Sequence, residues 1–193
     1  MRSAAVSFYP ETAPVPERKA TDRLLLRPLR VTDAEMDYEA VISSAAMLRR
    51  WSQSDWPADD FTLAENRRDL ERHEREHRER TAFTFTVLDP RATKCLGCIY
   101  IMPLRPEEAA LCPGANHGAR VGFWVRASEH SNELERHLLG TLREWLRTEW
   151  AFDAVVFTVY QQETRQAALL AEAGLEMRLK FTLPDGRACC AYA

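Results

Sequence analysis

The sequence contains little glycine, little excess charge and no long hydrophobic run. Seven glycines occur in 193 residues, about half of the average usage of about 7%, which excludes collagen-like and glycine-rich linker sequences. The 26 basic and 29 acidic residues leave a formal net charge of −3, which gives no support to nucleic-acid binding. No apolar run reaches about 18 residues, the length that a membrane-spanning helix needs. We therefore expect neither a nucleic acid nor a membrane as a partner.

The first 20 residues also lack the apolar segment of a secretory signal peptide. Pro10, Pro14 and Pro16 lie there among small and polar residues, so we expect residues 1–20 to form a flexible N-terminal arm on the surface. Without an export signal, the five cysteines are expected to be reduced thiols of a cytoplasmic protein. Their odd number also argues against a disulfide framework.

What is present is a series of apolar patterns of ordinary globular spacing. A hydrophobic share of 46% in 193 residues suits one domain that buries about 70% of its unfolded surface. The patterns predict strands over residues 23–29, 82–88, 95–102, 120–126, 154–160, 175–183 and 187–192, and helices over 32–49, 62–80, 132–149 and 164–173. The resulting β-α-α-β-β-β-α-β-α-β-β order predicts an α/β (α+β) domain over residues 21–193, with helices on the faces of a mixed central sheet.

Three segments carry a family resemblance. Residues 21–29 (TDRLLLRPL), residues 121–126 (VGFWVR) and residues 168–175 (ALLAEAGL) resemble the first strand, fourth strand and late helix of the GNAT acetyltransferase superfamily. They are most similar to the branch that acetylates ribosomal-protein and other N-termini. The resemblance implies a GNAT-like fold and transfer of an acetyl group from acetyl-CoA to the amine of a small molecule or peptide. It also allows a homodimer.

The resemblance further implies where acetyl-CoA would bind. In the family the cofactor lies between the fourth and fifth strands, so the backbone of Trp124, Val125 and Arg126 would hold the pantetheine arm. Ser131 and Asn132 would lie where the next helix begins, and unpaired N–H groups at a helix N-terminus attract a pyrophosphate.

Several positions depart from the family pattern. The loop over residues 130–135 (HSNELE) has no glycine, and its Glu133 and Glu135 bring negative charge toward the expected pyrophosphate. Arg120, Glu163 and Leu170 replace residues that bind or catalyse in the family, so no catalytic residue is assigned. Two hypotheses stay open, an N-acyltransferase with a divergent loop and a catalytically inactive ligand-binding or regulatory protein that no longer binds acetyl-CoA.

A loop rich in tryptophan and aspartate is the candidate acceptor site. Trp51 and Trp56 precede Asp59 and Asp60, and the four side chains could bind a cationic amine by cation–π contact and ion pairing. The alternative is that the tryptophans cover the core while an aspartate caps the following helix.

His73-Glu-Arg-Glu-His77 matches the zinc-protease motif H-E-x-x-H. The surrounding helix consists mostly of Glu, Arg and His, and no third ligand has a well-defined place, so we expect no metal. A milder interpretation places His73 and His77 on the wall of a substrate pocket.

Cys95 and Cys98 form a single C-x-x-C within an apolar strand. In a regular strand their side chains would face opposite sides of the sheet. We expect both to be small buried hydrophobes.

Overall fold

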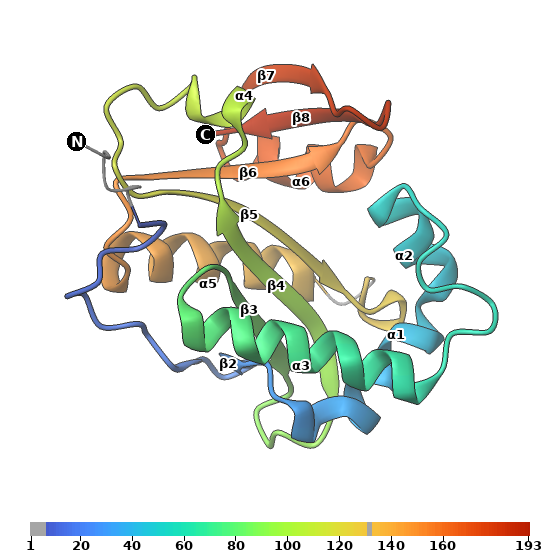
Figure 1. Ribbon diagram of the computed structural model, residues 1–193. Helices are drawn as coiled ribbons and strands as arrows, with labels where there is room; N and C mark the ends of the chain where they lie inside the picture. Colours follow the sequence, from blue (N-terminus) through green and yellow to red (C-terminus); the bar gives the residue numbers. More distant parts are fainter. Residues whose placement is uncertain (1–6, 131–132) are drawn as a thin grey trace.

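The computed structural model describes residues 7–130 and 133–193 (Figure 1). Within these residues the strands form one eight-stranded sheet of order β1-β2-β3-β4-β5-β6-β8-β7. The strands are β1 (Lys19–Ala20), β2 (Leu25–Pro28), β3 (Phe83–Leu88), β4 (Cys95–Pro103), β5 (Gly118–Val125), β6 (Ala154–Tyr160), β7 (Met177–Thr182) and β8 (Ala188–Tyr192). Only the β5–β6 pair is parallel, and the other neighbours are antiparallel. The mixed central sheet that the sequence predicts is therefore confirmed.

Helices cover both faces of this sheet (Figure 1). They are α1 (Ala34–Ser43), α2 (Ala45–Ser52), α3 (Leu63–Glu79), α4 (Pro106–Ala109), α5 (Leu134–Glu149) and α6 (Thr164–Glu172). The apolar stripe predicted for α5 is buried, and it packs with α6 in one core cluster. The helices α1, α2 and α3 pack in a second cluster on the opposite face. No described helix has the length and apolar character that crossing a membrane requires.

The strands β5 and β6 form a V. They pair only from Gly118 to Val121 on β5, opposite Ala154 to Phe157 on β6. Beyond these pairs the two strands diverge, as Figure 1 shows. On the side that faces β6, the diverging end of β5 has no partner strand. This is the opening that the family resemblance implies between its fourth and fifth strands.

One predicted helix is divided in two. The helix expected over residues 32–49 breaks at Ser44, whose φ of −117° and ψ of 12° are not helical. The Ser44 hydroxyl instead accepts a hydrogen bond from the Ala127 backbone N–H at 3.1 Å. The second part, α2, continues to Ser52, so Trp51 lies on a helix rather than in the predicted loop. Two short elements, β1 and α4, were not predicted.

The segment before β1 differs from the flexible surface arm that the prolines suggested. Tyr9 is fully buried, and its ring packs against Phe83 and Phe152 with centroids 5.5 and 4.9 Å away. Its hydroxyl donates to the Pro14 carbonyl at 3.0 Å and accepts from the Ala151 N–H at 3.1 Å. An aromatic anchor therefore ties this segment to the core, an interaction that the local composition of prolines does not reveal.

The prediction that Cys95 and Cys98 face opposite sides of the sheet is wrong. Both side chains are buried in the cluster beneath α1–α3. The β3–β4 register shifts between Val87 and Leu88, and this irregularity changes the alternation of side chains along β4. Both thiols are nevertheless small buried groups, as predicted.

Candidate functional site

A cavity of about 340 Å³ lies on the α1–α3 face of the sheet. Its floor is formed by alternate residues of two paired strands, Cys98, Tyr100 and Met102 on β4 opposite Trp124, Gly122 and Arg120 on β5. Residues of α1, α2 and α3 form its walls, and residues of β6 and β8 close its far side. We call this space the helix-side cavity.

Asp37 places a buried carboxyl group in this cavity. It projects from the buried face of α1 and lines the helix-side cavity. Its Oδ2 accepts a hydrogen bond from Asn66 Nδ2 at 3.0 Å, and the same amide donates to the Ala34 carbonyl at 3.1 Å. Burial raises the pKa of Asp37 to about 6. A carboxyl with a pKa this close to neutrality can accept a proton from a substrate.

Sequence reasoning missed Asp37, although a pattern was available. Asp37 lies within one helical turn of Met36, Ala40 and Val41, the apolar positions that predict the buried face of this helix. An acidic residue on such a face is rarely buried without a partner, so its position alone could have marked it.

The two predicted tryptophans line the cavity, but the two predicted aspartates do not. Trp51 packs on Tyr100 with ring centroids 5.8 Å apart. The Asp59 side chain is 94% exposed and forms an ion pair with Arg49 at 2.6 Å, and Asp60 is exposed as well. Neither aspartate caps α3, because the N-cap is Thr62, paired with Glu65 in a capping box. The carboxylates that line the cavity with the tryptophans are instead Asp37 and Asp69, of which Asp37 is buried.

The two predicted histidines have different surroundings. His73 lines the cavity, with Nδ1 3.0 Å from Thr84 Oγ1, and burial lowers its pKa so that it is neutral at pH 7. His77 packs edge-on against Phe83 and Phe85 instead. Glu74, the second residue of the H-E-x-x-H match, accepts a hydrogen bond from the Val31 N–H at 2.9 Å. Across residues 7–130 and 133–193, no group of three or more His, Cys, Asp or Glu could hold a metal ion.

A second cavity, of about 290 Å³, lies at the open end of the V. We call it the V cavity. It is lined by Met47, Arg50, Trp51, Trp124, Val125, His130, Glu135, Gln162, Glu163, Thr164, Arg165 and Gln166. Because Trp51 and Trp124 also line the helix-side cavity, the two cavities lie next to each other and share these residues in their walls.

Two backbone carbonyls of β5 that face the V accept hydrogen bonds from side chains. The Phe123 carbonyl accepts a hydrogen bond from Gln166 Nε2 at 2.8 Å, and the Val125 carbonyl accepts one from His130 Nε2 at 3.0 Å. Gln166 Nε2 also donates to Glu135 Oε1 at 3.2 Å, while its Oε1 accepts from Trp51 Nε1 at 3.2 Å. Gln166 therefore bridges β5, α2 and α5 across the V.

Only some of the residues that the resemblance assigned to acetyl-CoA binding line the V cavity. Trp124 and Val125 line the V cavity. The backbone N–H of Arg126 instead donates to the Leu96 carbonyl at 2.8 Å, and its guanidinium pairs with Glu39 at 2.6 Å. Ser131 and Asn132 lie outside the described residues.

The two carboxylates at the start of α5 both have cationic partners. Glu133 pairs with Arg136 at 3.3 Å, and the buried Glu135 pairs with Arg165 at 2.5 Å. Arg50 and Arg165 also line the V cavity. The negative charge that the sequence placed here is thus compensated by guanidinium groups, which are themselves suited to binding phosphate.

The model of the acetyltransferase (GNAT) domain family matches residues 23–176. The chain belongs to the GNAT family. A search of curated proteins finds no match.

Solved structures of this family share the fold over nearly the whole chain. RimL, a ribosomal L7/L12 alpha-N-protein acetyltransferase in complex with coenzyme A, is 15% identical, with 91% of this chain and 96% of that chain covered and a TM-score of 0.71. The microcin C7 self-immunity acetyltransferase MccE, in complex with acetyl-CoA and AMP, is 13% identical, with 89% and 92% covered and a TM-score of 0.71. The ribosomal-protein-S5-alanine acetyltransferase from Vibrio fischeri is 15% identical, with 92% and 95% covered and a TM-score of 0.64. At these identities the likeness concerns the fold.

Proposed function

We propose that this chain is an N-acyltransferase that takes an acetyl group from acetyl-CoA in the V cavity and transfers it to an amine in the helix-side cavity. The observation that carries this proposal is that the two cavities are adjacent and share Trp51 and Trp124 in their walls. A reaction of two substrates needs two binding spaces with one point of contact, since holding the reactants together removes much of the entropic barrier.

The residues of the V suit acetyl-CoA, provided that Gln166 releases the Phe123 carbonyl. A pantetheine arm carries amide groups, which would exchange hydrogen bonds with the β5 backbone in place of Gln166 and His130. Arg50 and Arg165 would hold the phosphates by charge-assisted hydrogen bonds. When bound, acetyl-CoA supplies the acetyl group as a thioester.

Asp37 is the group that we assign to proton removal. An amine must lose a proton as its nitrogen forms the new amide bond and the thiolate departs. Asp37 is largely ionised at pH 7 because its pKa is about 6, so its carboxylate can accept that proton.

Calorimetric titration with acetyl-CoA and with CoA tests the donor half of this proposal, and thioester consumption with a panel of primary amines tests transfer. We expect saturable binding of both nucleotides and amine-dependent release of free thiol. No heat with either nucleotide at millimolar concentration would overturn the proposal.

A specific observation also favours a second candidate, a GNAT-fold protein that binds a ligand but no longer binds acetyl-CoA. Both β5 carbonyls that face the V already accept hydrogen bonds from side chains, and Glu135 is buried beside them. The same titration separates the two candidates, because this second protein would give no heat with acetyl-CoA.

We also propose that the protein works in a reducing compartment such as the cytoplasm. Four of its thiols, those of Cys95, Cys98, Cys189 and Cys190, are buried, and burial raises the pKa of Cys95 to about 12. The Cys95 thiol therefore remains a protonated packing group.

A further inference from the structure

The two ends of the helix-side cavity carry opposite charges. Asp37 lies toward the Cys98–Trp124 row of the floor, where its charge, after burial, contributes to raising the pKa of Cys98. Arg120 forms the opposite end of the floor. Trp124 and Arg120 are four residues apart on β5, which is about 13 Å along a strand. Figure 1 shows that the antiparallel strands β4 and β5 extend between the α1 and α3 side of the molecule and the side of β6, β7 and β8.

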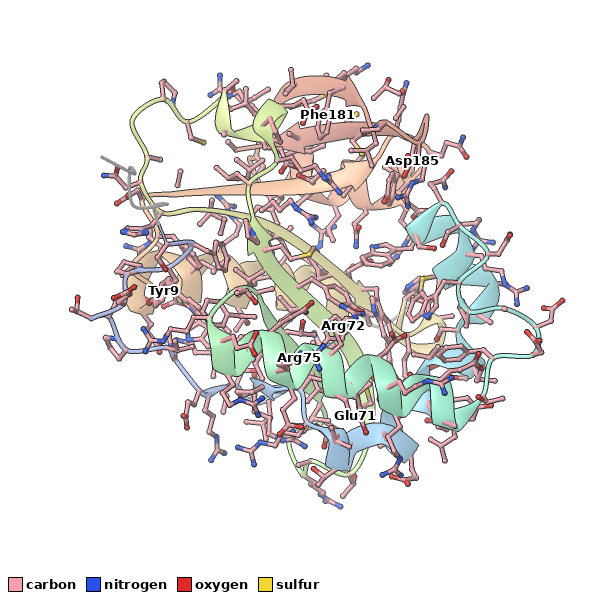
Figure 2. The ribbon with its side chains drawn as sticks, in the orientation of Figure 1. Tyr9, Glu71, Arg72, Arg75, Phe181 and Asp185 are labelled. Atoms are coloured by element: carbon pink, nitrogen blue, oxygen red, sulfur yellow. The ribbon has the colours of Figure 1, made fainter. Side chains whose placement is uncertain are left out.

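The basic end gathers three arginines from separate segments. Arg105 precedes α4, Arg120 lies on β5 and Arg187 follows the turn between β7 and β8, and all three line the cavity. The fully buried Glu108 pairs with Arg105 at 3.3 Å and lies 4.0 Å from Arg120. Arg187 pairs with Asp185, which is exposed and is labelled in Figure 2. Two carboxylates thus face three guanidinium groups.

Arg120 is the cation with the least compensation at this end. Its Nε donates to the Pro103 carbonyl at 3.1 Å and its Nη2 contacts Met102 Sδ at 3.2 Å, so neither contact supplies a negative charge. Burial, followed by the positive charge of Arg105, lowers the pKa of Arg120. An anion placed among these arginines would relieve both effects.

The acidic end is suited to a cation. Asp37 lines the cavity together with the aromatic side chains of Trp51, Trp56 and Tyr100, and aromatic faces attract an ammonium group. Arg72, labelled on α3 in Figure 2, does not reverse the charge here, because it pairs with Asp69 at 3.5 Å and with Glu76 at 3.4 Å.

We propose that the acceptor is a small zwitterionic molecule that carries a primary amine and, within about 13 Å of it, a carboxylate or a phosphate. The amine lies at Asp37 and the tryptophans, and the anionic group lies among Arg105, Arg120 and Arg187. The cavity volume of about 340 Å³ falls in the range of small-molecule sites. This inference rests on the proposed function, since it names the acceptor of the same site.

Calorimetry with three amines of equal chain length, 6-aminohexanoate, 6-aminohexyl phosphate and hexylamine, tests the charge requirement. We expect at least one of the two anionic amines to bind about 10-fold more tightly than hexylamine or better, as a charged hydrogen bond contributes. A preference between the two anionic amines identifies carboxylate or phosphate as the natural group. Equal binding of all three would overturn the inference.

Variants of the basic end test the residues. We expect Arg120→Gln, and independently Arg187→Gln, to remove the advantage of the anionic amine while leaving hexylamine binding unchanged. Arg178 lies on the exposed strand β7 and pairs with Glu176. Arg178→Gln is therefore the matched control, and it should change the binding of neither the anionic amines nor hexylamine. Circular dichroism confirms folding of each variant. An advantage that survives in both folded variants would contradict the assignment.

Because these titrations contain no acetyl-CoA, the inference and the proposed function fail separately. Arginine-dependent binding without thioester consumption would leave the zwitterion site standing and overturn acyl transfer. Efficient transfer to a peptide N-terminus that is indifferent to Arg120→Gln would overturn the zwitterion site and leave acyl transfer standing.

Discussion

Asp37 lies on the buried face of α1, where ionisation of a carboxyl is unfavourable. We expect Asp37→Asn to lower kcat by about 100-fold or more, the usual contribution of a general base, while acetyl-CoA binding stays unchanged. In the native protein kcat/KM should rise with pH and level off above a pKa of about 6. Steady-state kinetics from pH 5 to 8 measure both effects. The exposed Asp22→Asn is the control, and a pH profile that is flat across this range would exclude Asp37 as the base.

The same residue predicts a pH dependence of stability. The pKa of Asp37 is raised from 3.8 to about 6 on folding, so the folded state binds more protons between these values. The stability associated with the protonated carboxyl is complete below about pH 4 and is lost as the pH rises toward 6. Asp37→Asn keeps an acceptor for Asn66 without the charge, so at pH 8 it should raise the free energy of unfolding by at most about 3 kcal/mol. Urea unfolding at pH 5 and pH 8 measures this, and a larger gain at pH 5 would contradict it.

Gln166 lies across the V, where its side-chain amide donates a hydrogen bond to the Phe123 carbonyl. We expect Gln166→Ala to tighten acetyl-CoA binding by about 10-fold, because it frees the Phe123 carbonyl and removes one hydrogen bond that the ligand must otherwise replace. Calorimetry measures the change against Gln161→Ala, a control at an exposed position before α6. Weaker binding in Gln166→Ala would show instead that the glutamine contacts the ligand.

At the scale of the element, β4 depends on a glycine. A Cβ at Gly97 would lie 2.1 Å from the Trp124 carbonyl oxygen, whereas one at Gly140 on α5 would meet nothing within 4 Å. We expect Gly97→Ala to destabilise the fold by about 3 kcal/mol or more, since backbone must move. Gly140→Ala should stabilise α5 by about 0.5–1 kcal/mol. Chemical denaturation of both variants provides a matched comparison, and similar midpoints would contradict this account of β4.

Among the helices, sequence periodicity predicts the buried face of α5 but not the break between α1 and α2. The stripe from Leu134 to Leu146 on α5 is evident in the sequence, because a helix repeats its buried face every three or four residues. The break at Ser44 is not evident, because it depends on a hydrogen bond from Ala127, which is distant in the chain.

For the whole molecule, the segment before β1 contributes to stability. We expect Tyr9→Ala to lower the free energy of unfolding by about 3–5 kcal/mol, the usual loss for a buried aromatic ring. Tyr9→Phe should lose less, about 1–3 kcal/mol, because it leaves the Ala151 N–H without its acceptor. Thermal unfolding of both variants measures this, and unchanged midpoints would show that the segment adds nothing to the core.

The sequence by itself determined the order of the longer strands and helices, the mixed sheet and the family, since these follow from local periodicity and from short segments such as residues 121–126. Trp51, Trp56 and His73, which the sequence assigned to a substrate pocket, line one cavity of the structure. Only the tertiary structure decided which charges meet there. In the folded protein Asp59 is exposed to solvent, whereas Asp37 lines the same cavity as the two tryptophans. Glu135 pairs with Arg165, and Arg105, Arg120 and Arg187 line the same cavity. The physical reason is that electrostatic interactions act through space between groups from separate elements, whereas periodicity reports only which face of its own element a residue occupies.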